Sequence, residues 1–206
     1  MTPGFRRWTR AAALAIAVAA TPALAQEAPD ALVKRVSQDV LQSIKSDPLI
    51  QAGNEARIRE VIDGKLLPNF DFQRMTALAM GRNWRSASPD QQKRVVDEFR
   101  TLLVRTYSGA LNQYRNETID YKPLKMAASD TDVTVRTAVQ KPGGQPVPID
   151  YSMAKTGDGW KAYDVIVGGV SLVTNYRDEF NEQVKNGGVD GLIKALADRN
   201  KGGAAK

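Results

Sequence analysis

The order of apolar residues predicts an α+β fold, in which an antiparallel four-stranded sheet packs with about six helices. Apolar side chains recur every three or four positions over residues 29–114, as on one face of a helix, and they alternate with polar ones over residues 119–167, as in strands. Two glycine-bearing turns divide the alternating part, and helical spacing returns after Gly168-Gly169. The expected order is therefore four helices, a meander of four strands and two helices, with an apolar core between helices and sheet.

Three helices are predicted before residue 82, each with its own start or stop signal. The first begins at Pro29 and ends at Asp47-Pro48, because proline cannot continue a helix. The second begins after the N-cap Asn54 and stops at Pro68, and Asp71 caps the third. Their apolar faces hold Leu32, Val33, Val36, Val40, Leu41, Ile44, Ile58, Val61, Ile62, Leu66, Met75, Leu78 and Ala79.

The fourth helix has three agreeing start signals in Ser88-Pro89-Asp90-Gln91. They are an N-cap serine, a proline in the first turn and a glutamine at the capping-box position. We expect this helix to run to about Tyr114. Its apolar stripe holds Val95, Phe99, Leu102, Leu103, Thr106, Tyr107, Ala110 and Leu111.

Four strands follow, and Pro123 indicates that the first lies at an edge of the sheet or ends there. Strict alternation in the fourth strand assigns residues 160 and 166 to one face and residues 163, 165 and 167 to the other. Two helices close the chain. Gly187-Gly188 separates them, and the second ends at about Arg199.

The first 25 residues are typical of a cleavable secretory signal peptide. Arg6, Arg7 and Arg10 precede an apolar run over residues 11–20, which is too short to span a bilayer, and Ala23-Leu24-Ala25 is a small-x-small cleavage site. The arginine pair raises a twin-arginine route, but its surroundings fit that signal poorly, so ordinary secretion is favoured. We expect residues 1–25 to be removed, residues 26–200 to form a single domain and residues 201–206 to be a flexible tail. In a bacterium with two membranes, such a protein is periplasmic.

Composition excludes several classes of function. The 206 residues include no cysteine and no histidine, which removes cysteine nucleophiles, disulfides, serine–histidine triads and histidine metal sites. Loss of residues 1–25 lowers the net charge from +6 to +3, because 26 basic and 23 acidic residues remain. So small a charge does not indicate a nucleic-acid partner. No motif predicts a metal or a cofactor.

The remaining residues leave two interpretations open. An isomerase of the ketosteroid type would need an aspartate in an apolar cavity, and Asp150 or Asp164 are the candidates. The alternative is that these carboxylates face solvent or cap backbone. The apolar stripes are usually plain core, but they are rich in adaptable methionine and in tyrosine, which also suits a cavity for an apolar ligand.

The segment 70–107 contains the motifs Arg82-Asn-Trp-Arg85, then Pro89-Asp-Gln-Gln92 and Glu98-Phe-Arg-Thr-Leu-Leu103. With these motifs it closely resembles the MlaC family, also called the Ttg2 toluene-tolerance family of periplasmic phospholipid carriers. The similarity continues through residues 133–137, 148–153, 159–165, 169–180 and 188–193. It is weaker before Asp47.

The resemblance implies a sheet surrounded by helices, with a deep apolar pocket for the acyl chains of a diacyl phospholipid. It also implies shuttling between an outer-membrane lipoprotein–porin complex and an inner-membrane ABC transporter with an MCE-protein ring, which maintains outer-membrane lipid asymmetry. No enzyme activity is implied. A hopanoid or sterol carrier of the same fold is the alternative within the family.

Candidate pocket residues come from the inward face of each predicted element, and about half should be ordinary core because the same periodicity marks both. Trp84 is expected either at the pocket mouth or as an anchor of its corner. Arg82 and Arg85 are candidates to meet a phosphate or the acids of a partner, and simple solvation is the alternative. The lipid-binding candidates are Phe72, Met75, Leu78, Ala79, Phe99, Leu102, Leu103, Tyr107, Val133, Val135, Tyr151, Met153, Val165, Val167, Leu172, Val173, Tyr176 and Phe180.

Overall fold

The structure, a computed structural model, describes residues 26–111 and 117–202. The predicted signal peptide, the predicted helix end at Tyr114 and residues 203–206 of the predicted tail lie outside the described residues. Within the described ranges, no helix has the length and apolar character needed to cross a membrane.

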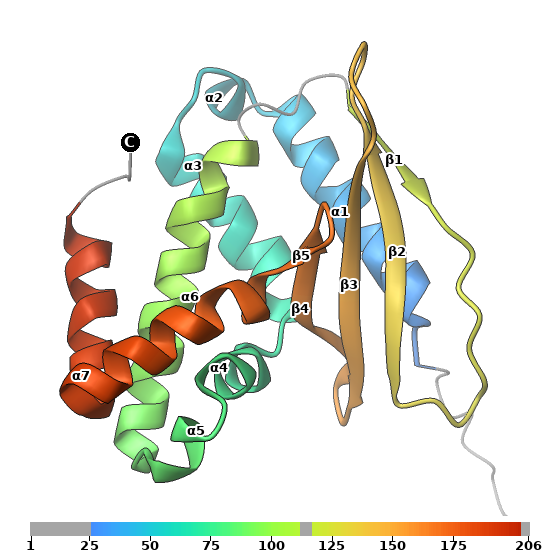
Figure 1. Cartoon of the computed structure of the whole chain (residues 1–206). Helices are drawn as coiled ribbons and strands as arrows, with labels where there is room; N and C mark the ends of the chain where they lie inside the picture. Colours follow the sequence, from blue (N-terminus) through green and yellow to red (C-terminus); the bar gives the residue numbers. More distant parts are fainter. Residues whose placement is uncertain (1–25, 112–116, 203–206) are drawn as a thin grey trace, which may run out of the picture.

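The helices lie together on one side of an antiparallel sheet, as Figure 1 shows. The helical segments before the sheet are α1 (Pro29–Ser46), α2 (Pro48–Gln51), α3 (Glu55–Val61), the π turn η1 (Ile62–Leu66), the 3₁₀ turn η2 (Leu67–Asn69), α4 (Phe72–Met80), α5 (Asn83–Ser86) and α6 (Pro89–Leu111). The strands and the last helix are β1 (Thr118–Tyr121), β2 (Asp132–Gln140), β3 (Val147–Thr156), β4 (Gly159–Val167), β5 (Val170–Ser171) and α7 (Leu172–Lys201).

The sheet confirms the predicted meander, with strand order β1-β2-β3-β4-β5 and antiparallel pairing throughout. β1 is an edge strand, as Pro123 predicted. The structure has one strand more than the four predicted. β5 is only two residues long, and it pairs with β4 through a turn in which Gly168 and Gly169 have φ of 58° and 86°, values that only glycine adopts readily.

The predicted faces of β4 are wrong because a β-bulge interrupts the alternation. Ser152 pairs with Asp164 while Met153 pairs with Ala162, so Tyr163 is the extra residue of the bulge. Trp160, before the bulge, packs under α1, and the valines beyond the bulge also face the helices. The two halves of β4 therefore contribute to the same interior.

Most predicted helix starts are confirmed by side-chain caps. Asp71 Oδ1 accepts a hydrogen bond from the Arg74 N–H at 2.9 Å. At the start of α6, the Ser88 N–H donates to Gln91 Oε1 at 3.0 Å and the Gln91 N–H donates to Ser88 Oγ at 3.2 Å, which is a complete capping box. The predicted break in the last helix is also present, because α7 bends sharply at Gly188 (φ 65°, ψ −170°), as Figure 1 shows.

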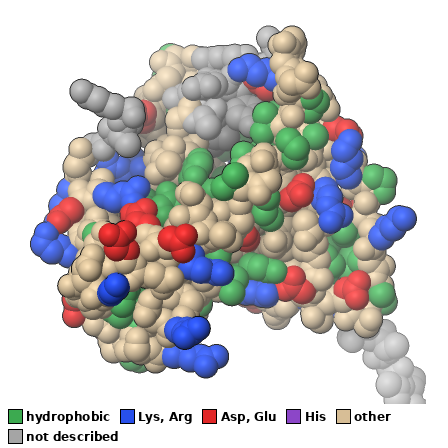
Figure 2. All heavy atoms as spheres, in the orientation of Figure 1, with side chains coloured by type: hydrophobic (Ala, Val, Ile, Leu, Met, Phe, Trp, Pro, Cys, Tyr) green, Lys and Arg blue, Asp and Glu red, His purple; other side chains and the backbone are tan. Residues whose placement is uncertain are grey.

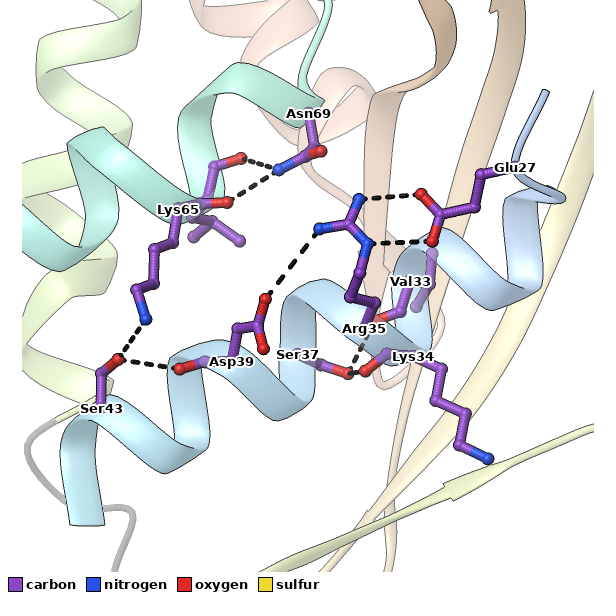
Figure 3. Close-up of polar contacts among 10 residues, drawn as sticks. Glu27, Val33, Lys34, Arg35, Ser37, Asp39, Ser43, Lys65 and Asn69 are labelled. Atoms are coloured by element: carbon purple, nitrogen blue, oxygen red, sulfur yellow. Dashed lines mark hydrogen bonds and ion pairs between the residues drawn. The ribbon is translucent and has the colours of Figure 1, made fainter. Parts of the chain in front are cut away.

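The single helix predicted from Asn54 to Pro68 is instead divided into α3, η1 and η2. Pro68 has no N–H to donate and cannot lie inside an α-helix, so the chain leaves α geometry before it. The Asn69 side chain donates to the carbonyls of Lys65 and Leu66 at 2.7 and 3.3 Å, and Lys65 Nζ donates to Ser43 Oγ of α1 at 2.8 Å (Figure 3). The π turn is thus held in place against α1.

Three apolar clusters form the interior. The first joins α4, α6 and α7 around the rings of Phe99, Tyr176 and Phe180, whose centroids lie 4.9–5.8 Å apart. The second joins α1 to the sheet, and the third joins α1, α2, α3 and η1. α1 belongs to the second and third clusters, and Val104 of α6 packs against the third, so apolar faces of both helices lie next to the space between helices and sheet.

Candidate functional site

An apolar cavity of about 260 Å³ lies between the helices and the sheet. Its helical wall comes from α1, η1, η2, α4, α6 and the first residue of α7, and its other wall from β1 to β4. Cross-strand pairs place the sheet residues in rows, with Tyr151 opposite Val165 and Ile149 opposite Val167. Strand pairing and helix periodicity therefore aim side chains from distant parts of the sequence at one space.

The cavity opens to the surface beside two of its own lining residues. Tyr107 and Val167 are 40% and 37% exposed although both line the cavity. Figure 2 shows hydrophobic side chains at the surface of this face, between the helical part and the sheet. Exposed apolar groups at the edge of an apolar cavity are typical of a mouth for a hydrophobic ligand.

The structure brings eight of the eighteen predicted pocket residues to the cavity. They come from four separate segments, namely α4, α6, the β3–β4 pair and the start of α7. The eight are Phe72, Met75, Leu103, Tyr107, Tyr151, Val165, Val167 and Leu172.

The other ten predicted residues lie outside the cavity wall. Leu78 is 36% exposed on the outer side of α4. Six belong to the cluster of α4, α6 and α7, and three to the cluster between α1 and the sheet. These nine are Ala79, Phe99, Leu102, Val173, Tyr176 and Phe180 in the first, and Val133, Val135 and Met153 in the second.

Twelve of the lining residues were not predicted from the sequence. Helical or strand periodicity had already marked several as apolar faces, but nothing in the sequence distinguished a cavity wall from core. They are Ser37, Val40, Leu41, Ile62, Leu66, Leu67, Phe70, Val104, Ser108, Ile119, Val139 and Ile149. Trp84 is not among them; it packs against the cluster of α4, α6 and α7 and anchors its corner.

Hydroxyl groups are the polar side-chain groups of the cavity wall, and among the described lining residues none carries a carboxylate, an amine or a guanidinium. Ser37 Oγ lies 2.7 Å from Tyr121 Oη, which links α1 to β1. Burial, with Tyr176 adjacent, raises the pKa of Tyr107 above its ordinary value, so this phenol stays neutral at physiological pH. The wall is suited to enclosing apolar groups and has no acid–base pair.

Neither aspartate considered for an isomerase lines the cavity. Asp164 Oδ1 accepts hydrogen bonds from the Val165 and Val173 N–H groups at 2.8 and 3.1 Å, and its other oxygen accepts one from Ser171 Oγ. Asp150 lies on the sheet face turned away from the cavity, 4.0 Å from the Arg136 guanidinium. Asp164 therefore anchors the start of α7.

The family profile of the MlaC protein matches residues 34–198, which is most of the chain. The chain belongs to the MlaC family. This confirms the resemblance predicted from the segment 70–107 and extends it into α1, where the motifs are weakest.

Relatives of this MlaC-family protein include toluene tolerance protein ttg2D of Pseudomonas putida, 27% identical over 180 residues, which are 86% of this chain and 83% of that protein. The binding protein MlaC of the intermembrane phospholipid transport system of Haemophilus influenzae is 25% identical over 177 residues, 84% of this chain and 83% of that one. Among solved structures, the phospholipid-binding protein of Ralstonia solanacearum, in complex with a phospholipid, is 45% identical with a TM-score of 0.78. That match covers 83% of this chain and 96% of the Ralstonia chain.

Proposed function

We propose that this MlaC-family protein is a periplasmic carrier of diacyl phospholipid, with the acyl chains held in the cavity between helices and sheet. The main support is an uncharged apolar cavity in a chain that is 45% identical to a phospholipid-binding protein solved with its lipid. The eight predicted residues at the cavity wall are the proposed acyl-chain contacts, together with the twelve lining residues that the sequence did not distinguish.

The physical need for such a carrier follows from the cost of exposing acyl chains. A chain of roughly sixteen carbons costs on the order of 12 kcal/mol to expose to water. The cavity wall can bury methylenes but offers no counter-charge, so the headgroup stays in solvent at the mouth. The proposed selectivity is therefore for chains and not for headgroups.

The size of the cavity has a further consequence for loading. At about 260 Å³ it lies just below the roughly 300–1,000 Å³ usual for ligand pockets. Two acyl chains need more room, so loading must move the helical wall away from the sheet.

In this proposal the carrier transfers phospholipid between two membrane complexes and does not modify it chemically. Its partners are an outer-membrane lipoprotein–porin complex and an inner-membrane ABC transporter with an MCE-protein ring, and the exchange maintains outer-membrane lipid asymmetry. Family membership and the predicted signal peptide support this assignment. The polar side chains among the described lining residues carry only hydroxyl groups, which supports a carrier over an enzyme.

Mass spectrometry of bound lipid tests the proposal. The protein is purified from periplasm without detergent, extracted with organic solvent, and the extract is analysed. Diacyl phospholipid is the expected result. A polycyclic terpenoid would instead identify a hopanoid or sterol carrier, and an empty extract from protein that also takes no lipid from vesicles would exclude both carriers.

A filled cavity gives a second test with a matched control. Leu103→Trp places an indole in the cavity, and we expect the bound phospholipid per protein to fall severalfold. Thr101→Trp adds the same group on the exposed side of α6 and should leave the lipid content unchanged. Equal lipid content in two folded variants would remove Leu103 from the proposed contacts.

A further inference from the structure

A second hollow, of about 930 Å³, lies at the surface where α4, α5 and α7 meet. Three arginines line it, Arg82 and Arg85 from the corner at α5 and Arg177 from α7, and all three are exposed. The Asn83 side chain donates to Asn181 Oδ1 at 2.8 Å, which holds the corner against α7. Elements far apart in the chain thus place guanidinium groups around one depression.

These arginines differ from most others in the protein in having no ion pair with a described residue. Seven of the twelve described arginines pair with a carboxylate, and three of the remaining five line this hollow. No described carboxylate lines it either. Like charges gathered without counter-charges repel one another and do not stabilise the fold, so their arrangement favours an external anion.

The hollow is separate from the lipid cavity. The two share no lining residue: on α4, Phe72 and Met75 line the cavity, whereas Ala77 and Leu78 line the hollow. The three arginines are therefore not part of the wall proposed to hold the acyl chains. Figure 2 shows Lys and Arg side chains at the lower edge of the helical part, beside a notch next to the sheet.

We propose that this hollow is a docking site for an acidic segment of a partner protein. Guanidinium groups present paired N–H donors that match carboxylates, and the Asn181 amide adds further donors. Leu78, 36% exposed, gives the hollow an apolar floor for a neighbouring side chain of the same segment. A concave site of this kind fits a protruding chain better than the flat surface of a membrane.

A peptide titration tests the docking site. The purified, lipid-loaded protein is added to a fluorescein-labelled peptide in which glutamates alternate with leucines, and fluorescence anisotropy is read at low and high salt. We expect binding that weakens with salt, and a loss of about tenfold in each of Arg85→Glu and Arg177→Glu, as for removal of one charge-assisted contact. Arg59→Glu is the matched control, because Arg59 is also exposed and forms no ion pair with a described residue, but it lies on α3.

Three results would overturn the proposal. One is an absence of salt-sensitive peptide binding by the unaltered protein, and another is an equal loss in Arg59→Glu. The third is dependence on these arginines for binding to vesicles of phosphatidylglycerol but not to the peptide. Lipid content and melting temperature are measured in each variant and should not change. A failure of the carrier proposal would appear in lipid content alone, so the two failures are distinguishable.

Discussion

Leu102 and Leu103 are consecutive on α6 and almost equally buried, with 5% and 7% of their surface exposed. Both belong to the cluster of α4, α6 and α7, but only Leu103 also borders the cavity. A helix turns by about 100° per residue, which is enough to move one side chain from close-packed core to a cavity wall. Burial alone therefore does not identify the lipid-contacting residues.

This pair gives a stability prediction. In lipid-free protein, Leu102→Ala should lower the free energy of unfolding by about 2–5 kcal/mol, the usual cost of an emptied core position. Leu103→Ala should cost less, since its side chain already borders empty space and loses fewer contacts. Urea unfolding of both variants measures the difference, and a larger cost at Leu103 would contradict the assignment of the cavity wall.

Two tyrosines near the cavity predict behaviour at high pH. Burial raises the pKa of Tyr107 and Tyr176, which for Tyr176 is partly offset by the charge of Arg199. The folded state then favours the neutral phenols. Their contribution to stability is complete below the ordinary tyrosine pKa of about 10 and is lost as the pH rises through the higher folded-state values.

Ultraviolet absorbance of phenolate checks this pH dependence. In the folded protein, part of the phenolate absorbance should appear only at pH values above the ordinary tyrosine pKa. Tyr176→Phe should reduce that part of the absorbance change. If every tyrosine of the folded protein titrated in the ordinary range, the result would contradict the raised pKa values of Tyr107 and Tyr176.

At the scale of single elements, helix starts are set by local contacts. The capping box at Ser88 satisfies backbone N–H groups through residues three positions apart, so the sequence alone predicts where α6 starts. Ser88→Ala should therefore lower the free energy of unfolding by about 1 kcal/mol. Ser46→Ala, at an exposed position with no cap, is the control. Equal effects in thermal or urea unfolding would contradict the role of the box.

The start of α7 depends instead on a contact between elements. Asp164 of β4 accepts hydrogen bonds from the backbone at Val165 and Val173. Asp164→Ala leaves these donors without partners and should cost about 1–3 kcal/mol. Hydrogen exchange should accelerate at the Val173 amide while amides of α1 stay protected. Unchanged exchange at Val173 would show that the carboxylate does not anchor the helix.

At the scale of the whole molecule, the cavity links cargo to stability. A ligand that binds only the folded protein stabilises it by about 2.7 kcal/mol when present at a hundred times its dissociation constant. Protein stripped of lipid should therefore melt at a lower temperature than loaded protein. Calorimetry before and after reloading from vesicles measures the shift, and identical melting temperatures would argue against cargo in the cavity.

The sequence predicted the order of elements, the meander and most caps because each depends on residues close together in the chain. The bulge at Tyr163 and the π turn η1 were not predicted. A bulge depends on how two strands align, and the π turn depends on Pro68 together with contacts to α1. Predictions for these segments failed because their cause is not local.

By itself, the sequence determined the α+β class, the helix starts and the apolar faces, since periodicity and capping are properties of short segments. Only the tertiary structure decided which apolar residues line a cavity and which fill the core, because that depends on how far apart the packed faces lie. It also decided that Asp164 caps a helix. For the same reason, only the fold brought Arg177 to the corner at Arg82 and Arg85.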